Sequence, residues 1–251
     1  MEEYTGYSHA DSIYFARENL DFLFNILMGY DFYIAGGFVT RCIYKYLHNK
    51  DFINPMIDSQ DIDIFSENSC EAERIRNKLL SAGAELKEKN KVSLNEKLIY
   101  NGIKIDLIFA NAFLGNPLHR IQYFDMSQCA FMIAYDKAYY LENSMECIEN
   151  SKIKLNFVNN THFDIKRIYK YKRRGFKLDS EDLKFIESNE KNGQMQFNVN
   201  ENYYGNTDAW PCGIYPNKHK DVIKFVFDGE ILENISGKNS AFSGYNGIMH
   251  W

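Results

Sequence analysis

Cysteine and proline are scarce in this sequence of 251 residues, which contains five cysteines and four prolines. The cysteines form no CxxC pair and have no spacing typical of a zinc site, which argues against a disulfide-stapled scaffold and a zinc-based fold. The sequence also lacks an apolar run long enough to span a bilayer, and its polar, acidic start lacks the regions of a signal peptide. We therefore expect a cytoplasmic protein with reduced thiols and no membrane contact.

The composition is that of a folded protein with a large core. Hydrophobic residues make up 45% of the chain, aromatic residues 16% and charged residues 25%. The net charge of −5 argues against a surface built entirely for nucleic acid, but it leaves room for a local basic face. After residue 188 the sequence becomes rich in Asn, Gly and aromatic residues. This shift predicts a main domain over residues 1–188 and a C-terminal appendage over residues 189–251.

The first part of the chain is predicted to contain helices and strands in alternation. Helical spacing of apolar residues from Asp11 to Met28 predicts an opening helix. A β-type run at Asp31–Ala35 ends at Gly36-Gly37 and is followed by a helical pattern over Val39–Leu47. A second strand is expected at Asp61–Phe65, with a charged helix after it. The local order is thus strand, glycine turn, helix, loop and strand.

A β-hairpin is predicted further along. Lys91–Tyr100 and Ile103–Ala110 have strand character and are joined by Asn101-Gly102, the strongest short hairpin signal in a sequence. Later apolar stretches either extend the sheet or pack a helix beside it, and Thr161–Arg174 is predicted to be helical. The whole pattern predicts an α+β fold, close to α/β, in which a mixed β-sheet is flanked by helices and carries the C-terminal appendage.

Three aspartates lie on the predicted strands. In Asp61-Ile62-Asp63 a single apolar residue separates two acids, so both carboxylates point to one face of the strand. Asp106 interrupts an otherwise apolar strand. Carboxylates so close repel one another unless a cation lies between them, and Mg²⁺ or Mn²⁺ prefers such oxygen ligands. If the two strands are neighbours, the three acids form a metal site that serves phosphoryl chemistry.

The glycine turn is a candidate phosphate site. Without a Cβ at Gly36 and Gly37, backbone amides at the start of the following helix approach phosphate oxygens closely. Thr40 and Arg41, one turn into that helix, add a hydroxyl and a cation. We therefore predict that Gly36, Gly37, Thr40 and Arg41 bind nucleotide.

These motifs together resemble the polymerase β-type nucleotidyltransferase superfamily. The runs that carry the resemblance are Ala35-Gly36-Gly37-Phe38-Val39-Thr40-Arg41, Asp61-Ile62-Asp63-Ile64-Phe65 and Lys104-Ile105-Asp106-Leu107. The nearest relatives suggested by the motifs are the head domains of tRNA nucleotidyltransferases and bacterial poly(A) polymerases. The resemblance covers roughly residues 30–180 and implies a catalytic domain with metal on Asp61 and Asp63 and NTP phosphates at the glycine turn.

A later stretch of the chain is a loose counterpart of another family motif. The run Arg120 to Ala130 resembles the family's Arg-Arg-Asp-Phe-Thr-Ile-Asn-Ala, although the usual basic pair is missing. Asp125 is therefore a candidate for base or ribose contact, and a sheet acid hydrogen-bonded to backbone is an equal alternative. The interval between Gly37 and Asp61 is also longer than in tRNA nucleotidyltransferases. The acceptor is therefore not implied by the resemblance.

A basic segment follows, with seven cations among the twelve residues 166–177 and aromatic residues interleaved. On a helix Arg167, Lys170 and Arg174 share one face, while Tyr169 and its apolar neighbours pack inward. This face is a candidate contact for a triphosphate or for the phosphates of RNA or DNA. A face that is merely solvated explains the segment equally well.

The combined reading is a metal-dependent nucleotidyltransferase that transfers a nucleotide from an NTP to a hydroxyl acceptor. Asp61, Asp63 and Asp106 would bind Mg²⁺ or Mn²⁺, and Asp106 would also activate the acceptor, which is an RNA 3′ end, a small molecule or a protein side chain. Two other readings stay open: an inactive nucleotide- or nucleic-acid-binding module of the same fold, and a metal-dependent phosphohydrolase. The base of the NTP and the oligomeric state do not follow from the sequence.

Overall fold

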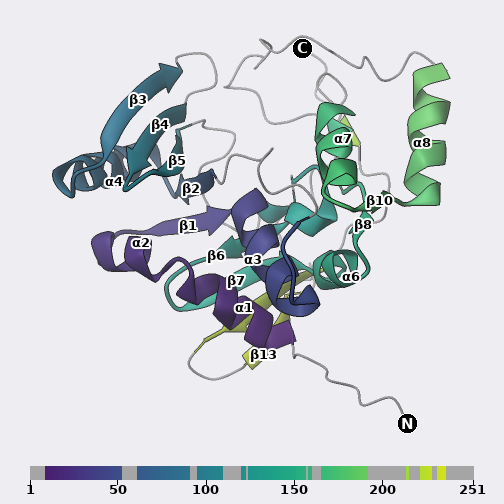
Figure 1. Ribbon diagram of the computed structural model, residues 1–251, viewed down its shortest axis with the longest axis horizontal. Coiled ribbons are helices and arrows are strands. Elements are labelled where there is room, and N and C mark those ends of the chain that lie inside the picture. Colours follow the sequence, from purple (N-terminus) through teal and green to yellow (C-terminus); the bar gives the residue numbers. More distant parts are fainter. Residues whose placement is uncertain are drawn as a thin grey trace.

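A nine-stranded mixed sheet organises the protein in this computed structural model (Figure 1). The described residues are 9–52, 61–90, 95–109, 120–122, 124–156, 158–159, 165–191, 213–214, 221–227 and 231–235. From edge to edge the strands are β13 (Ile231–Ile235), β12 (Val222–Val226), β7 (Lys137–Leu141), β6 (Phe131–Ile133), β1 (Phe32–Ala35), β2 (Ile62–Ser66), β5 (Ile103–Ile108), β4 (Asn95–Tyr100) and β3 (Glu85–Asn90). The expected mixed sheet flanked by helices is confirmed.

One pair of neighbouring strands in this sheet is parallel. β2 and β5 are parallel neighbours, whereas the other neighbouring pairs of the sheet are antiparallel. The helices are α1 (His9–Glu18), α2 (Asp21–Ile26), α3 (Gly37–His48), α4 (Ser69–Ser81), the 3-10 helix η3 (Ser127–Cys129), α6 (Ser144–Glu149), α7 (Ile165–Arg173) and α8 (Ser180–Lys191). Short strands form two further pairs, β8 (Lys152–Ile153) with β10 (Lys177–Leu178) and β9 (Val158–Asn159) with β11 (Gly213–Ile214).

One face of the sheet is apolar and is covered by helices. Its centre is formed by completely buried residues of β2, β5 and β4, which are Ile62, Ile64, Leu98, Ile105 and Leu107. Phe22 of α2 stacks on Tyr100 of β4, and Arg76 of α4 forms an ion pair with Glu96 of β4 at 3.2 Å. Tyr100 and Glu96 share the face of Leu98 because residues two apart on a strand point the same way. The opposite face therefore carries the aspartates.

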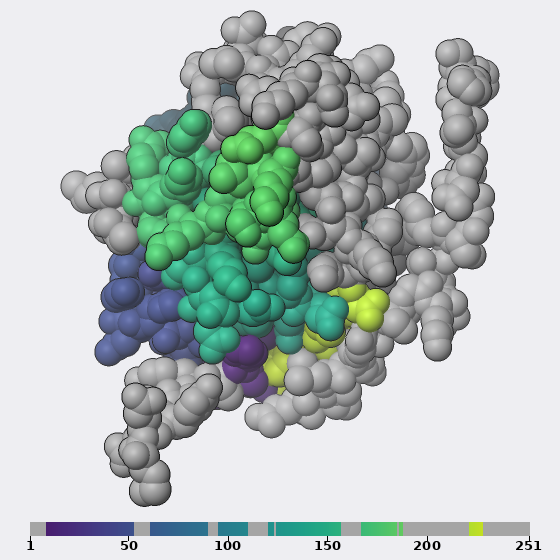
Figure 2. All heavy atoms as spheres, turned by 90° about the vertical axis from the view of Figure 1, so that its right-hand side faces the viewer, coloured from purple at the N-terminus to yellow at the C-terminus, as the bar shows by residue number. Residues whose placement is uncertain are grey.

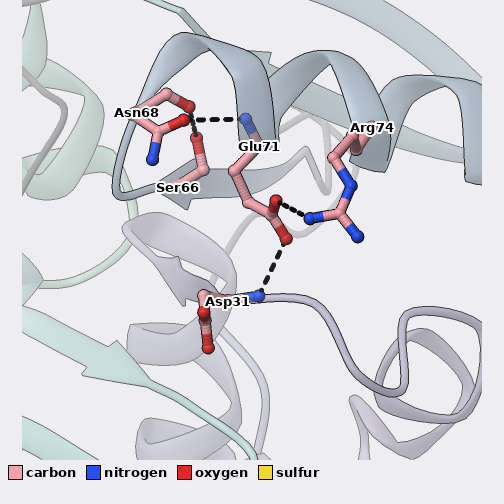
Figure 3. A network of polar contacts seen from close by, with 5 residues as sticks. All are labelled: Asp31, Ser66, Asn68, Glu71 and Arg74. Atoms are coloured by element: carbon pink, nitrogen blue, oxygen red, sulfur yellow. Dashed lines mark hydrogen bonds and ion pairs between the residues drawn. The ribbon is translucent and has the colours of Figure 1, made fainter.

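A polar network fixes the start of β1 against the end of β2 (Figure 3). Asn68 caps α4 by accepting a hydrogen bond from the Glu71 amide at 2.9 Å, and the Ser66 hydroxyl donates to the Asn68 carbonyl at 2.9 Å. The buried Glu71 carboxylate accepts from the Asp31 amide at 3.2 Å and pairs with Arg74 at 2.6 Å. The network joins α4 to two strands, β1 and β2, whose other ends build the candidate site.

The opening helix predicted over residues 11–28 is two helices in the structure. α1 ends at Glu18 and α2 begins at Asp21, with a turn between them in which the Leu20 amide donates to the Arg17 carbonyl at 2.9 Å. Leu20 is nevertheless completely buried. The apolar spacing continues through the turn, so the sequence pattern does not reveal the break.

Strands from beyond residue 188 belong to the same sheet. β12 pairs with β7 and with β13, and Tyr14 of α1 donates a hydrogen bond to the carbonyl of Phe227, directly after β12. The rings of Tyr14 and Phe227 are also in contact, at 5.2 Å between centroids. The division of the chain at residue 188 stays a prediction, but its two sides share one sheet. Within the described residues, no helix is long and apolar enough to cross a membrane.

Candidate functional site

Asp63 and Asp106 are partners in the register of the parallel strands β2 and β5. The strands are neighbours, as the convergence of the acids requires, and both carboxylates point away from the helix-covered face. Asp61 immediately precedes β2 and lies on the same side as Asp63. The three predicted acids therefore gather on one side of one place in the sheet.

The glycine turn closes directly against one of these acids. Gly36, between β1 and α3, has φ +81°, a left-handed conformation that favours glycine. A Cβ built at Gly36 would lie 2.3 Å from Oδ2 of Asp63, so any side chain there would collide with the carboxylate. Ala35, the preceding residue, is the β1 register partner of Asp63. The backbone of the turn and the Asp63 carboxylate are thus in direct contact, with no room for a side chain between them.

Burial and mutual repulsion make these acids hard to ionise. Burial, together with the nearby charge of Asp106, raises the pKa of Asp63 to about 7. Burial and the charge of Asp61 raise the pKa of Asp106 to about 6. The positive charges of Arg167 and Lys170 of α7 act against this rise and lower the pKa of Asp63. A site that holds several carboxylates at this cost is typical of one completed by a cation.

The donor set fits a hard divalent ion, although the carboxylates are not yet grouped around one. Oδ1 of Asp61 is buried without a hydrogen-bond partner among the described residues. Within those residues, no three His, Cys, Asp or Glu side chains form a ready-made metal cluster. The Asp63 carboxylate instead lies against Gly36. Binding Mg²⁺ or Mn²⁺ would require the acids to turn toward one another, which their shared face of the sheet allows.

Thr40 and Arg41 have structural partners where we expected nucleotide contacts. Thr40 is completely buried, and its hydroxyl lies within donating distance of two carbonyls, those of Gly36 at 3.1 Å and Gln128 at 2.9 Å. Arg41 holds Asp51 with two guanidinium nitrogens, and this pairing lowers the pKa of Asp51. A hydroxyl directed into the core does not reach a phosphate, so the role predicted for Thr40 is corrected to fastening α3 to η3.

The predicted cationic face of α7 is also arranged differently. Arg174 is 3% exposed, and its guanidinium lies over the rings of Phe52 and Tyr171, at 4.9 and 4.6 Å. Tyr169, expected to pack inward, is instead 55% exposed. Arg174 therefore points inward, and the three cations do not share one exposed face.

Arg174 nevertheless lies beside the glycine turn. A Cβ built at Gly37 would meet Nη1 of Arg174 at 3.6 Å and the hydroxyl of Tyr171 at 3.7 Å. Tyr171 is 2% exposed and accepts a hydrogen bond from the thiol of Cys129 at 2.9 Å. The start of α3 is thus enclosed by the end of α7.

Asp125 is paired with Arg167 of this helix. Nε of Arg167 lies 2.8 Å from Oδ2 of Asp125. The backbone around Asp125 is held by Asn156, whose amide nitrogen donates to the Asp125 carbonyl at 2.8 Å and whose side chain donates to the carbonyls of Gln122 and Phe124. The positive charge of Arg167 also lowers the pKa of Asp63. The structure therefore brings Asp125, Arg167 and the acids into one neighbourhood.

Two residues of this neighbourhood were missed from the sequence. Tyr171 was hidden within the basic segment, where no pattern marked it as buried. Lys97 of β4 is the register partner of Asp106, and its charge opposes the repulsion that raises the pKa of Asp106. A signal for Lys97 does exist in the sequence. A two-residue turn at Asn101-Gly102 pairs Tyr100 with Ile103, and counting back along both strands then pairs Lys97 with Asp106.

The similar proteins found are solved structures. No protein-family model and no curated protein sequence matches the chain. A tRNA nucleotidyltransferase complexed with a primer tRNA and an incoming ATP analog is 16% identical, with 71% of this chain and 50% of that one covered and a TM-score of 0.47. A CCA-adding enzyme with ATP is 16% identical, with 70% and 43% covered and a TM-score of 0.48.

A third match is the Bacillus stearothermophilus CCA-adding enzyme in complex with CTP. It is 15% identical, with 68% of this chain and 40% of that one covered and a TM-score of 0.40. The chain spans half or less of the length of these three proteins. These are general likenesses, and no residue role follows from them.

Proposed function

We propose that this protein is a metal-dependent nucleotidyltransferase, which transfers NMP from an NTP to a hydroxyl acceptor and releases pyrophosphate. One observation carries the proposal. Asp63 and Asp106 lie side by side on parallel strands, and the positive-φ Gly36 turn closes against the Asp63 carboxylate. This arrangement suits a metal-bound triphosphate, because the acids bind the metal ion and the backbone amides at the helix start bind the phosphate oxygens.

The acids of the site hold the metal in this proposal. Asp61, Asp63 and Asp106 are the ligands for Mg²⁺ or Mn²⁺, and the otherwise unpaired Oδ1 of Asp61 is one of the donor atoms. The ion supplies neutralisation of the charge that develops on the transferred phosphoryl group. Asp106, with a pKa raised to about 6, also accepts the proton of the attacking hydroxyl.

Basic groups complete the nucleotide site in this proposal. The amides at Gly36 and Gly37 bind phosphate oxygens, since the first amides of a helix have no acceptor within the helix. Arg167 and Lys170 stand close enough to Asp63 to affect its pKa, so they balance the charge of the triphosphate. Asp125 orients Arg167 through their ion pair. Arg174 supports the turn from within the core.

The acceptor proposed is an RNA 3′ end. The exposed side of α7 carries Tyr169, Lys172 and Arg173, and the ammonium of Lys172 lies 6.0 Å from the centre of the Tyr169 ring. α7 and α8, drawn in green, form part of the molecular surface turned to the viewer in Figure 2. An exposed aromatic ring between cations is typical of surfaces that stack bases and bind the backbone of a single strand.

Labelling tests the proposal. The protein is incubated with each α-labelled NTP, Mg²⁺ or Mn²⁺, and total RNA, and both labelled RNA and pyrophosphate are measured. The variant Asp61→Asn/Asp63→Asn should lose at least about a hundredfold in rate, because two ligands of the ion are gone, while Asp136→Asn, an exposed acid elsewhere, should stay active. NTP binding without pyrophosphate release would instead support an inactive binding module, and release of orthophosphate would support a phosphohydrolase.

A further inference from the structure

Four charged residues form one row across the sheet. The register pairs Glu88 of β3 with Lys97 of β4, Lys97 with Asp106 of β5, and Asp106 with Asp63 of β2. Register partners point to the same face, so the four side chains lie on one face of the sheet. Lys97 is the cation of this row, and it stands between two carboxylates.

Lys97 is held loosely enough to change partners. Its ammonium lies 3.1 Å from Oε2 of Glu88, and the two side chains are 47% and 50% exposed. Exposed ion pairs of this kind contribute little stability, so exchanging one anionic partner for another costs little. The hydrogen bond to Glu88 raises the pKa of Lys97, with a contribution from Asp106, which keeps the side chain charged near neutral pH.

The cations around the acids come from two different elements. The charges of Arg167 and Lys170 of α7 lower the pKa of Asp63. The charge of Lys97 of β4 lowers the pKa of Asp106, its register partner. A triphosphate bound at the acids would therefore meet cations of both elements, of which the sequence marked only those of α7.

We infer that Lys97 is a nucleotide-binding residue, whose positive charge in the nucleotide-free protein lies beside Asp106 and opposes binding of the divalent ion, and which turns to phosphate oxygens when nucleotide enters. This inference rests on the proposed function. It makes Lys97 a regulator of the order of binding, because the ion binds the acids more readily once a triphosphate has drawn the ammonium away. Metal and nucleotide then bind with positive cooperativity through a single side chain.

The inference requires effects of opposite sign from one substitution. Lys97→Met keeps most of the aliphatic stem and removes the charge. Without metal, binding of ATP or another NTP in EDTA should weaken about three- to tenfold, since one half-exposed charge contact is lost. Without nucleotide, Mn²⁺ should bind about two- to fivefold more tightly, because a competing positive charge is removed. A residue that merely supports the strand would not give this pair of results.

The experiment uses the full chain and two equilibria. Free Mn²⁺ is measured by electron paramagnetic resonance during titration of the nucleotide-free protein, and NTP binding in EDTA is measured by calorimetry with all four NTPs. Lys89→Met is the matched control, since Lys89 is a neighbouring, half-exposed lysine of β3 that pairs with Glu96 toward the opposite face. Both of its constants should stay within about twofold of those of the wild type, as expected for a surface charge that points away from the acids.

A second variant changes Glu88, the ion-pair partner of Lys97, and leaves Lys97 in place. Glu88→Gln releases Lys97 without removing it, so metal-free NTP binding should strengthen about twofold, a change typical of one exposed ion pair. If wild type binds both ligands and Lys97→Met changes neither constant, or weakens both, the inference is wrong and the proposed function stands. If wild type binds neither Mn²⁺ nor any NTP, the proposed function falls and this inference with it.

Discussion

The carboxylates of Asp63 and Asp106 stand at the same level of two adjacent parallel strands, on the face of those strands opposite the apolar one that α2 and α4 cover. The opposite face at the same level carries completely buried isoleucines and leucines. Apolar burial on one side of the strands therefore maintains the proximity of two like charges on the other. The stability of the protein should depend on how those charges are compensated.

The first prediction concerns the pH dependence of stability without metal. The pKa of Asp63 is raised to about 7 in the folded protein, whereas an unfolded Asp titrates near 4. Between these values the folded state binds more protons than the unfolded state, so the free energy of unfolding falls as pH rises from about 4 to about 7. The penalty is complete above about pH 7 and should reach roughly 2–4 kcal/mol.

Urea unfolding at pH 5 and pH 8 in EDTA measures this penalty. Asp63→Asn should reduce the difference between the two pH values, because an amide does not ionise, whereas Asp136→Asn should leave it unchanged. Mg²⁺ should stabilise wild type more at pH 8 than at pH 5. If the free energy of unfolding of wild type and of Asp63→Asn changed equally with pH, the pKa of Asp63 would not be raised in the folded protein.

The second prediction compares two glycines with positive φ. Gly36 and Gly29 have φ +81° and +85°, but a Cβ at Gly36 would collide with Asp63, while a Cβ at Gly29 would meet nothing within 4 Å. Gly29→Ala should therefore cost only the backbone strain, about 1 kcal/mol. Gly36→Ala should cost at least about 2 kcal/mol more, the size of an overpacking penalty, and should weaken Mn²⁺ binding. Equal melting temperatures for the two variants would contradict the close approach of Gly36 to Asp63.

The third prediction concerns the network of Figure 3, in which one buried acid serves two partners. Glu71→Ala should destabilise the protein by about 1–3 kcal/mol, because the Asp31 amide loses its acceptor. Arg74→Ala should cost less than about 0.5 kcal/mol, since Arg74 is 65% exposed. Chemical denaturation of both variants separates the backbone contact from the ion pair, and a larger loss for Arg74→Ala would reverse this assignment.

Much of the framework could be predicted from the sequence because it depends on local signals. Asn101-Gly102 forms the turn of the β4–β5 hairpin, with positive φ at both residues, as the two-residue turn requires. β3 was missed because Glu85–Asn90 is almost entirely charged and lacks alternation. Such a strand forms at the edge of a sheet through pairing with its neighbour, which is information held elsewhere in the chain.

The candidate site was predictable in its acids and its glycine turn but not in its cations. The acids stand out because they interrupt apolar strands. The position of Arg174, directly after α7, depends on two aromatic rings: Phe52, far away in the sequence, and Tyr171 enclose its guanidinium, which removes it from the exposed face expected from helical spacing alone. The same limit applies to Thr40, whose carbonyl partner Gln128 is 88 residues away.

The fourth prediction tests the corrected role of Thr40. Thr40→Val replaces a buried hydroxyl with a methyl group of similar size. It should lower the free energy of unfolding by about 1–2 kcal/mol, because the carbonyls of Gly36 and Gln128 lose a donor. NTP affinity, measured by calorimetry, should stay within about twofold of wild type, as for a residue without a ligand contact. Tenfold weaker NTP binding with unchanged stability would restore the phosphate role first expected.

The last prediction concerns the exposed side of α7. Tyr169→Ala should weaken binding of a single-stranded oligoribonucleotide about tenfold, the effect of losing one stacking contact. Lys172→Gln should weaken it less, and it should reduce the slope of log affinity against log salt by close to one, because one phosphate contact is lost. Fluorescence anisotropy over a range of salt concentrations measures both quantities. Leu183→Ala is the control, since Leu183 is an exposed residue of the neighbouring α8.

Three substrates separate the kinds of nucleic acid that α7 binds. A single RNA strand should bind more tightly than an RNA duplex of the same length, because stacked bases in a duplex are not available to the Tyr169 ring. A DNA strand of the same sequence tests whether the 2′-hydroxyl contributes. If Tyr169→Ala and Leu183→Ala bind RNA alike, stacking on α7 is excluded, and the acceptor must then bind elsewhere while the acids and the glycine turn keep their proposed roles.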